Sequence, residues 1–241
     1  MKNKAVILAA LFFIVVLFIL VFNQRDSMKL YWLFICVLTW SGIFSQNVLF
    51  DPVSGKIFNP EKYSDISGSP FLFDKWINGS VSTPRGVYKN LQLKLDVYNN
   101  TIFFNKDDQA FEFQDQISGF ILEPKSGDSL IYLKGLTGNG LRSEQFVQVL
   151  ALGKTSFYKS EQRLFAEINQ INKGIVKKFT TSVRYYININ DKLQLIRLNK
   201  SELLGVLNDK LGLLEEFTRQ NKIDYRREAD VAKLIKHLNS L

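Results

Sequence analysis

The chain has 241 residues, of which 46% are hydrophobic and 13% aromatic, so it can form a packed core and is not a disordered polymer. It carries 31 lysines and arginines against 23 aspartates and glutamates, a formal net charge of +8. The basic residues are spread along the chain, with Lys177-Lys178 and Arg226-Arg227 as the densest pairs. This distribution indicates a solvated surface with a mild preference for anionic neighbours and argues against a nucleic-acid-binding protein.

Two hydrophobic segments lie at the start of the chain. Residues 5–22 are 18 uninterrupted apolar residues behind Lys2 and Lys4, just long enough to span a bilayer as a helix. Residues 30–44 are shorter, follow Lys29 and end in small residues, the three parts of a secretory signal. We therefore expect a hydrophobic extension over 1–27 and a signal peptide over 28–45, with cleavage between Ser45 and Gln46.

Three interpretations of these segments remain open. In the first, translation starts at Met28 and residues 1–27 are an over-extended start. In the second, the first segment anchors the protein in the inner membrane. In the third, both segments span the membrane as a hairpin. The hairpin is least favoured, because Arg25 and Lys29 in its loop would be retained in the cytoplasm. The single cysteine, Cys36, lies in the second segment and would be discarded with it, which leaves no cysteine for a disulfide.

The first strands are predicted from residue 46 onward. Residues 46–75 are rich in Pro, Gly, Ser and Asp and indicate extended pieces separated by turns. Residues 91–97 alternate strictly between apolar and polar side chains, which predicts a strand with one buried face. Asn99-Asn100 predicts a turn, since Asn tolerates positive φ, and residues 101–104 predict the partner strand.

Short strands continue at a spacing of about ten residues, which is typical of an antiparallel sheet, a sandwich or a partial barrel. A glycine-rich loop over 134–144 interrupts the series, and Asn190-Asp191 predicts the turn of a last hairpin. The predicted strands are 110–113, 117–122, 129–133, 145–152, 155–160, 183–189 and 192–198.

After residue 199 the apolar spacing becomes helical, with leucines three or four residues apart. Asn199 or Ser201 is expected to cap the first helix, Asn208-Asp209 to start a second one, and a last helix is expected over about 226–239. The predicted fold class is therefore α+β: an antiparallel β-rich domain over 46–198, followed by a helical segment over 199–241.

The sequence offers few catalytic residues. Its single histidine, His237, lies in a basic amphipathic helix, and with no cysteine after residue 45 the usual zinc, haem and iron–sulfur ligand sets cannot be assembled. We expect no metal and no cofactor. The glycine-rich loop over 134–144 lacks the Gly-Lys-Ser/Thr ending of a phosphate loop, although Arg142 within it can contact a ligand.

Carboxylates keep a hydrolase open as an alternative, because a glycosidase needs only two of them at the right separation. The candidates are Asp107, Asp108, Glu112, Asp115, Glu123 and Asp128, all on or beside predicted strands.

Aromatic side chains form the other candidate site, a stacking platform for a sugar or a peptide. The aromatics considered are Trp76, Tyr88, Tyr98, Tyr158, Tyr185 and Tyr186. The residues chosen as candidate ligand contacts are Trp76, Tyr88, Tyr98 and Arg142.

Residues 68–104 carry a recognisable pattern: Gly68-Ser69-Pro70-Phe71-Leu72, then Trp76, Gly79-Ser80-Val81 and residues 93–99, "LKLDVYN". In this pattern, and in residues 146–160 and 185–222, the chain resembles a group of functionally uncharacterised exported proteins of Bacteroidetes-type Gram-negative bacteria. The resemblance implies export to the envelope and a start at Met28, and it carries no catalytic residue.

From these observations we expect an exported, non-catalytic accessory protein that contacts a partner protein or a cell-wall glycan. It would reside in the periplasm or outer envelope, with membrane contact only through its N-terminal segments. The alternatives are a carbohydrate-active hydrolase with paired carboxylates and an inner-membrane-anchored component of an envelope complex.

Overall fold

The computed structural model describes residues 56–170, 174–207 and 211–241. Both N-terminal hydrophobic segments, the expected cleavage point and Cys36 lie outside these residues, and so does the expected helix start at Asn208-Asp209. Among the described residues, no helix is both long enough and apolar enough to cross a membrane.

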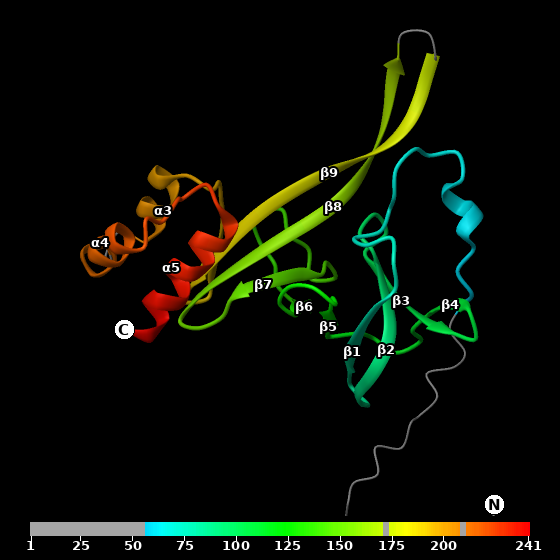
Figure 1. The fold of residues 1–241 in the computed structure, drawn as a ribbon, viewed down its shortest axis with the longest axis horizontal. Coiled ribbons are helices and arrows are strands. Elements are labelled where there is room, and N and C mark those ends of the chain that lie inside the picture. The colour runs from blue at the N-terminus through cyan, green and yellow to red at the C-terminus, as the bar shows by residue number, and fades with distance from the viewer. Residues whose placement is uncertain (1–55, 171–173, 208–210) are drawn as a thin grey trace, which may run out of the picture. The chain divides into compact units, whose positions relative to one another are not determined.

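The described part of the chain forms ten antiparallel strands in one open sheet, followed by three C-terminal helices (Figure 1). This confirms the predicted α+β class. Of the three forms predicted for the strands, an antiparallel sheet, a sandwich and a partial barrel, the structure has the antiparallel sheet. The strands are β1 (Ile77–Thr83), β2 (Gly86–Asp96), β3 (Thr101–Lys106), β4 (Gln109–Glu112), β5 (Gly119–Glu123), β6 (Leu130–Leu133), β7 (Val147–Ala151), β8 (Thr155–Gln170), β9 (Gly174–Ile189) and β10 (Lys192–Ile196). Their order across the sheet is β10-β9-β8-β7-β6-β5-β1-β2-β3-β4.

Tight turns between neighbouring strands set the registers of the sheet. The β2–β3 turn has Asn100 at φ 56°, and the β9–β10 turn has Asn190 and Asp191 at φ 50° and 61°. Asp107 and Asp108 form the β3–β4 turn at φ 51° and 60°. Short polar side chains tolerate this left-handed backbone, so the predicted turns at Asn99-Asn100 and Asn190-Asp191 are confirmed. The same preference gives Asp107 and Asp108 a structural reason for their positions.

One face of the sheet packs the first core around β2, β3 and β5. Leu93 pairs with Phe104 and Leu95 with Ile102, which brings the apolar half of the predicted alternation into the interior. Phe120 of β5 stacks on Tyr132 of β6 with ring centroids 4.7 Å apart.

Strands β8 and β9 are much longer than predicted. Each has 16 residues, and they stay paired from Thr155↔Ile189 to Gln170↔Gly174. Beyond the length of β7 and β10 they continue as a two-stranded ribbon, which we call the arm (Figure 1). The sequence predicted strands only over 155–160 and 183–189 in this region, because polar and charged residues between them obscure the alternation.

The helices α3 (Lys200–Val206), α4 (Leu211–Gln220) and α5 (Glu228–Ser240) form a second core with the other end of the sheet. As predicted, Asn199 caps α3, accepting a hydrogen bond from the Glu202 backbone N–H at 2.9 Å. Asn239 of α5 bonds to both the N–H and the carbonyl of Thr155 in β8. The buried residues of this core are Ala151, Phe157, Ile187, Ile196, Leu203, Leu207, Leu214, Val231, Ala232, Leu234, Ile235 and Leu238.

Candidate functional site

Residues 56–73, which precede the sheet, cross the face of β2 that the sequence predicted to be exposed. We call this segment the strap. The Phe58 N–H donates to the Ala110 carbonyl beside β4, and the Leu72 N–H donates to the Leu95 carbonyl of β2, both at 2.9 Å. The Ser67 N–H donates to the backbone carbonyl of Lys177 in the arm at the same distance. The strap therefore joins the β4 edge, β2 and the arm.

A buried carboxylate fastens the middle of the strap. Asp96, at the end of β2, is fully buried and accepts a 2.5 Å hydrogen bond from the Tyr63 hydroxyl. The same carboxylate accepts the N–H groups of Tyr98 and Asn99, both at 2.9 Å. Burial, and next the hydrogen bond to Asp96 and the charge of that carboxylate, raise the pKa of Tyr63 far above its ordinary value, so this hydroxyl stays a donor.

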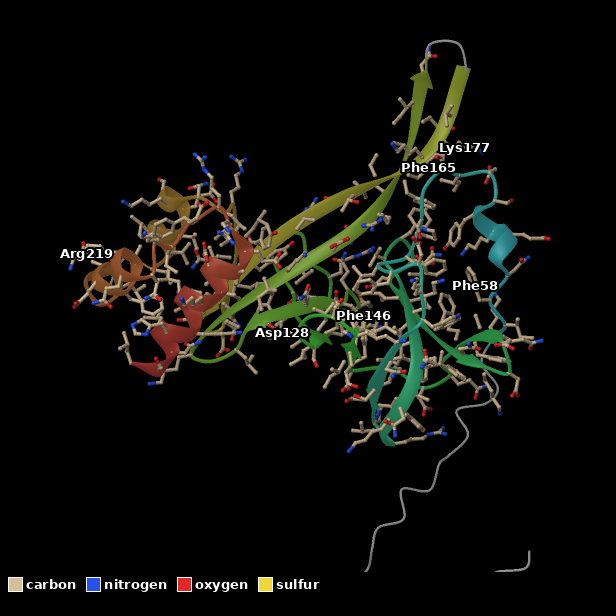
Figure 2. The ribbon with its side chains drawn as sticks, viewed as in Figure 1. Phe58, Asp128, Phe146, Phe165, Lys177 and Arg219 are labelled. Atoms are coloured by element: carbon tan, nitrogen blue, oxygen red, sulfur yellow. The ribbon has the colours of Figure 1, made fainter. Side chains whose placement is uncertain are left out.

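Aromatic rings form a row along the strap. Phe58 contacts Phe103 of β3, with centroids 4.7 Å apart, and Phe71 at 5.8 Å. Tyr63 continues the row from Phe58, at 6.1 Å, to Tyr98, at 6.0 Å. The row places edge-to-face and tilted rings side by side over the second face of β2 and β3 (Figure 2, near the label of Phe58).

At one end of this row lies a cavity of about 370 Å³, which we call the aromatic pocket. The ammonium group of Lys94 lies 4.5 Å from the ring centroid of Phe71 and 5.5 Å from that of Trp76. The lining residues are Ile57, Phe58, Phe71, Trp76, Lys94, Phe103, Asp108, Gln109 and Ala110.

Lys94 is the charged group of the pocket. Its partial burial lowers the pKa of the ammonium, and the nearby Asp74 carboxylate offsets part of this shift. The aromatic faces attract the cation through their π electrons. They do not accept N–H hydrogen bonds as water does, so the ammonium keeps donors that a ligand can use. The pocket thus combines flat apolar walls with a desolvated donor, an acceptor in Asp108 and an amide in Gln109.

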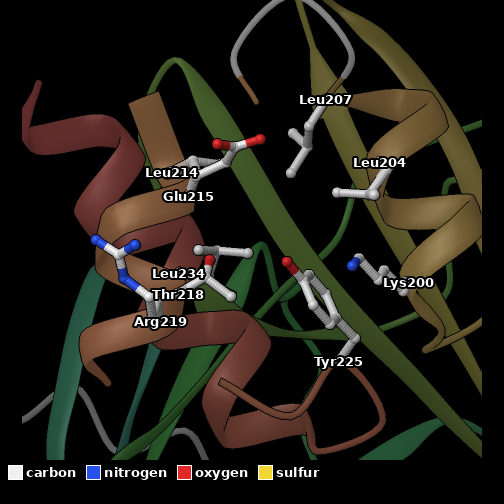
Figure 3. A pocket seen from close by; sticks show the side chains of 9 residues that line it. All are labelled: Lys200, Leu204, Leu207, Leu214, Glu215, Thr218, Arg219, Tyr225 and Leu234. Atoms are coloured by element: carbon white, nitrogen blue, oxygen red, sulfur yellow. The ribbon is translucent and has the colours of Figure 1, made fainter. Parts of the chain in front are cut away.

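A second cavity, of about 320 Å³, lies between the three helices (Figure 3). Its walls include the core leucines Leu207, Leu214 and Leu234, while Lys200 and Arg219 are exposed residues at its side. These leucines belong to the second core and provide no polar group to a ligand. The aromatic pocket provides both rings and polar side chains, so we place the candidate site there.

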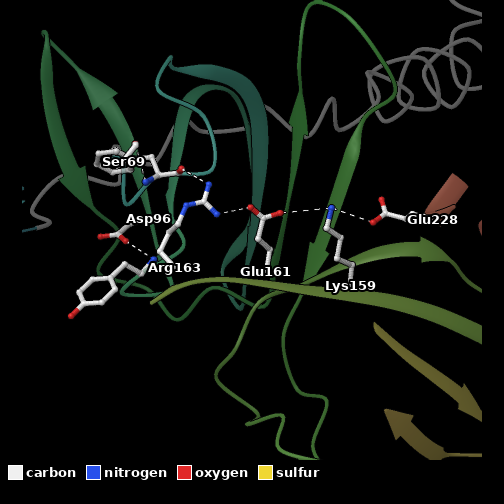
Figure 4. A network of polar contacts seen from close by, with 8 residues as sticks. Ser69, Asp96, Lys159, Glu161, Arg163 and Glu228 are labelled. Carbon is white, nitrogen blue, oxygen red and sulfur yellow. Dashed lines mark hydrogen bonds and ion pairs between the residues drawn. The ribbon is translucent and has the colours of Figure 1, made fainter. Parts of the chain in front are cut away.

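A chain of ion pairs leads from the helices to the strap (Figure 4). Lys159 of β8 lies 3.2 Å from Glu228 of α5 and 3.7 Å from Glu161. Glu161 pairs with Arg163 at 2.7 Å, and the Arg163 guanidinium donates to the Phe71 carbonyl at 3.4 Å. Because Phe71 is a wall of the aromatic pocket, this chain fixes the position of that wall relative to β8.

The structure places the four predicted contact residues differently. Trp76 lines the aromatic pocket, and Tyr98 stands at the far end of the aromatic row, where its ring packs 5.1 Å from Phe179. Tyr88 of β2 donates instead to Asp115 at 3.3 Å. Arg142 lies in the loop between β6 and β7, where its backbone N–H donates to the Gln145 side chain. Trp76 therefore belongs to the aromatic pocket and Tyr98 to the far end of the aromatic row, while Tyr88 and Arg142 make other contacts.

Two of the other aromatics considered for a platform are core residues. Tyr158 and Tyr186 are only 4% and 1% exposed and lie opposite each other in the β8–β9 pairing, so they cannot take part in the stacking platform considered for them. Tyr185 is half-buried and donates to Glu228 at 2.9 Å.

The predicted carboxylates are distributed over several strands and loops. Asp108 lines the aromatic pocket, whereas Glu112 and Asp115 line a separate, smaller pocket together with Phe146. Glu123 ends β5, and Asp128 lies in the turn before β6 (Figure 2).

Sequence reasoning missed most of the pocket. Lys94 was assigned to the exposed face of its strand, and Phe58, Phe71 and Phe103 were not singled out. One signal was present: Phe103 and Phe104 are adjacent in a strand, so an apolar ring must face each side of the sheet. Both are buried, which shows that both faces are covered.

Metal ligands do not gather within the described residues, where no three His, Cys, Asp or Glu side chains are placed to hold an ion. His237 is half-buried and stacks on Phe217, with centroids 3.8 Å apart.

Comparison with protein-family models, with curated proteins and with solved structures found no match to this chain. The resemblance to exported envelope proteins therefore stays a prediction.

Proposed function

We propose that the protein is an exported, non-catalytic binding protein of the cell envelope, which holds a sugar unit of an envelope glycan in the aromatic pocket. The observation that carries the proposal is the position of the Lys94 ammonium against Phe71 and Trp76 inside the cavity. Export and envelope location rest on the predicted signal peptide over residues 28–45.

A sugar ring matches the two kinds of surface that the pocket offers. One face of a pyranose is a set of C–H groups that packs on aromatic rings, and its hydroxyls need donors and acceptors at the edge. Trp76 and Phe71 supply the rings, while Lys94, Asp108 and Gln109 supply the polar partners. The cavity volume, about 370 Å³, lies within the range of small-molecule sites.

Tryptophan fluorescence provides the test. Trp32 and Trp40 precede the expected cleavage point, so a processed chain isolated from the envelope has Trp76 as its single tryptophan. We expect soluble cell-wall glycan fragments to change the emission of Trp76 in a saturable manner. Lys94→Met keeps the aliphatic stem but removes the charge, and should weaken binding about tenfold or more by loss of a charge-assisted hydrogen bond. Tyr88→Phe, outside the pocket, is the matched control.

The pH dependence of binding gives an independent readout. Lys94 is a cationic donor below its pKa, and burial lowers that pKa from the usual 10.5. Affinity should therefore fall as the pH rises toward 10.5, and Lys94→Met should remove this fall. If fragments do not bind, or Lys94→Met binds as well as the parent, the pocket is not the glycan site.

Two observations favour the hydrolase alternative: the carboxylate of Asp108 lines the aromatic pocket, and Glu112 and Asp115 together line a smaller pocket. The same mixtures should be assayed for new reducing ends. Cleavage that Asp108→Asn abolishes would replace the binding proposal by a hydrolase.

A further inference from the structure

The smaller pocket that contains Glu112 and Asp115 has charged groups of both signs in its lining, and we call it the polar pocket. Its volume is about 170 Å³, below the range of sites for drug-sized ligands, so it suits a small molecule. It shares no lining residue with the aromatic pocket. The lining residues are Asn100, Thr101, Ile102, Glu112, Phe113, Asp115, Gln116, Ile117, Lys134 and Phe146.

Lys134 supplies the positive charge of the polar pocket. Its half-buried ammonium lies 4.0 Å from the ring centroid of Phe146 (labelled in Figure 2) and has no ion pair within the described part of the chain. Burial lowers the pKa of this ammonium, and the charge of Glu144 offsets part of the shift. Asn100 holds the segment behind the ring: it accepts the Phe146 N–H at 2.8 Å and donates to the Glu144 carbonyl at 2.7 Å. The cation therefore has a defined position and N–H donors that a ligand can use.

Glu112 supplies an uncompensated negative charge. The other carboxylate of the pocket, Asp115, already lies 3.3 Å from the Arg85 guanidinium and accepts the Tyr88 hydroxyl at 3.3 Å. Glu112 is half-buried at the end of β4, where its backbone N–H donates to the Lys56 carbonyl at 3.1 Å. Its carboxylate has neither a hydrogen bond nor an ion pair among residues 56–170, 174–207 and 211–241.

These two charges select a ligand that carries both opposite charges. Glu112 and Lys134 line one cavity but make no ion pair with each other. A simple anion would be attracted by Lys134 but repelled by Glu112, and a simple cation would meet the reverse. A zwitterion compensates both charges at once, through two charge-assisted hydrogen bonds. Because partly buried charges are costly until they are paired, this ligand gains the most from the site.

We propose that the polar pocket binds a free α-amino acid, with the ligand ammonium at Glu112 and the ligand carboxylate at Lys134. An α-amino acid has both charged groups on one carbon atom, which suits a cavity of this size. A neighbouring cavity of about 490 Å³ shares Gln116, Ile117 and Lys134 with the polar pocket and leaves room for the ligand side chain. The site uses none of the residues of the aromatic pocket, so amino-acid binding and glycan binding are tested separately.

Isothermal titration calorimetry at pH 7 on the full chain, purified in detergent, tests the proposal with three probes. Alanine carries both charges, N-acetylalanine lacks the ammonium, and alaninamide lacks the carboxylate. We expect alanine to bind about tenfold or more tightly than either derivative, because each derivative loses one charge-assisted hydrogen bond and leaves one protein charge unpaired.

Substitutions at the two charges should have opposite effects on this selectivity. Lys134→Met should weaken alanine binding about tenfold or more and remove the preference for alanine over alaninamide, but keep the preference over N-acetylalanine. Glu112→Gln should do the reverse, whereas a general loss of structure would weaken all three probes alike. Lys125→Met and Glu123→Gln, at exposed positions outside the pocket, are the matched controls and should change nothing.

Three results would overturn the proposal. In the first, alanine does not bind to the parent chain. In the second, N-acetylalanine or alaninamide binds as tightly as alanine, which would make the pocket a site for a simple anion or a simple cation. In the third, Lys134→Met and Glu112→Gln lose the same preference.

Discussion

At the scale of single residues, the molecule departs from what its strand pattern predicts on one face of β2. Lys94 and Asp96 are the polar half of a strict alternation, yet Lys94 is half-buried against aromatic rings and Asp96 is fully buried. Burying a carboxylate is costly unless hydrogen bonds replace its water. Asp96 has them from Tyr63, Tyr98 and Asn99, which is why the strap can close over it.

Tyr63→Phe should destabilise the fold by about 1.5–3 kcal/mol, because it removes a hydrogen bond to a buried charge while keeping the ring. Urea unfolding measures this as a lower midpoint with an unchanged slope. Tyr88→Phe is the control, since its hydroxyl is 3.3 Å from the part-exposed Asp115, and should cost less than about 1 kcal/mol. Equal losses in the two variants would contradict the role given to Asp96.

At the scale of elements, β1 shows how a glycine fits between neighbouring strands. Gly79 lies between β2 and β5, and its register with β2 shifts before Val81. A Cβ atom here would overlap the Ile121 backbone carbonyl.

Gly79→Ala should therefore destabilise the protein by about 1–3 kcal/mol, because a strand backbone cannot move aside as a flexible side chain can. Gly205→Ala, in α3, has no atom within 4 Å of the added methyl and should stabilise by about 0.4–1 kcal/mol. Thermal unfolding of the pair checks both signs. A stable Gly79→Ala variant would show that β1 is not confined as described.

The link between α5 and the sheet is also an element-scale feature. Lys159 lies between Glu228 and Glu161, and the three side chains are only 18–30% exposed. Removing its charge takes the ion-pair partner from Glu228, whereas Glu161 keeps its pair with Arg163.

Lys159→Met should cost about 1–3 kcal/mol, between the values for exposed and buried ion pairs. Combining it with Glu228→Gln should recover part of the loss, as a double-mutant cycle in denaturant would show. Strict additivity of the two changes would mean that the ion pair does not hold α5 to β8.

At the scale of the whole molecule, three tyrosines couple stability to alkaline pH. Burial, as the largest cause, raises the pKa of Tyr63, Tyr132 and Tyr185 above their ordinary value. Above pH 10 the unfolded chain loses these protons while the folded chain keeps them, so the free energy of unfolding falls as the pH rises. Burial lowers the pKa values of Lys94 and Lys134, so below about pH 10.5 these two lysines make the free energy of unfolding rise with pH. Above about pH 10.5 they are deprotonated in both states and no longer change the pH dependence of stability.

We therefore expect stability to decline steeply above about pH 10.5, measured by urea unfolding at a series of pH values. Tyr132→Phe keeps the ring stacked on Phe120 and removes one titrating group, so it should flatten the decline. An unchanged slope would mean that Tyr132 ionises alike in both states.

The sequence by itself determined the strand pairs and turns of β2–β3 and β9–β10, and the helical C-terminal segment, for which it offered Asn199 as one of two caps. These depend on side-chain period and local backbone preference, which residues a few positions apart decide. Only the tertiary structure decided the strap, the arm and the aromatic pocket. Phe58 and Phe71 meet Lys94 and Phe103 because the chain returns over the second face of the sheet. That contact joins residues more than 20 positions apart, and its stability comes from burial and from the Asp96 hydrogen bonds, which no local pattern encodes.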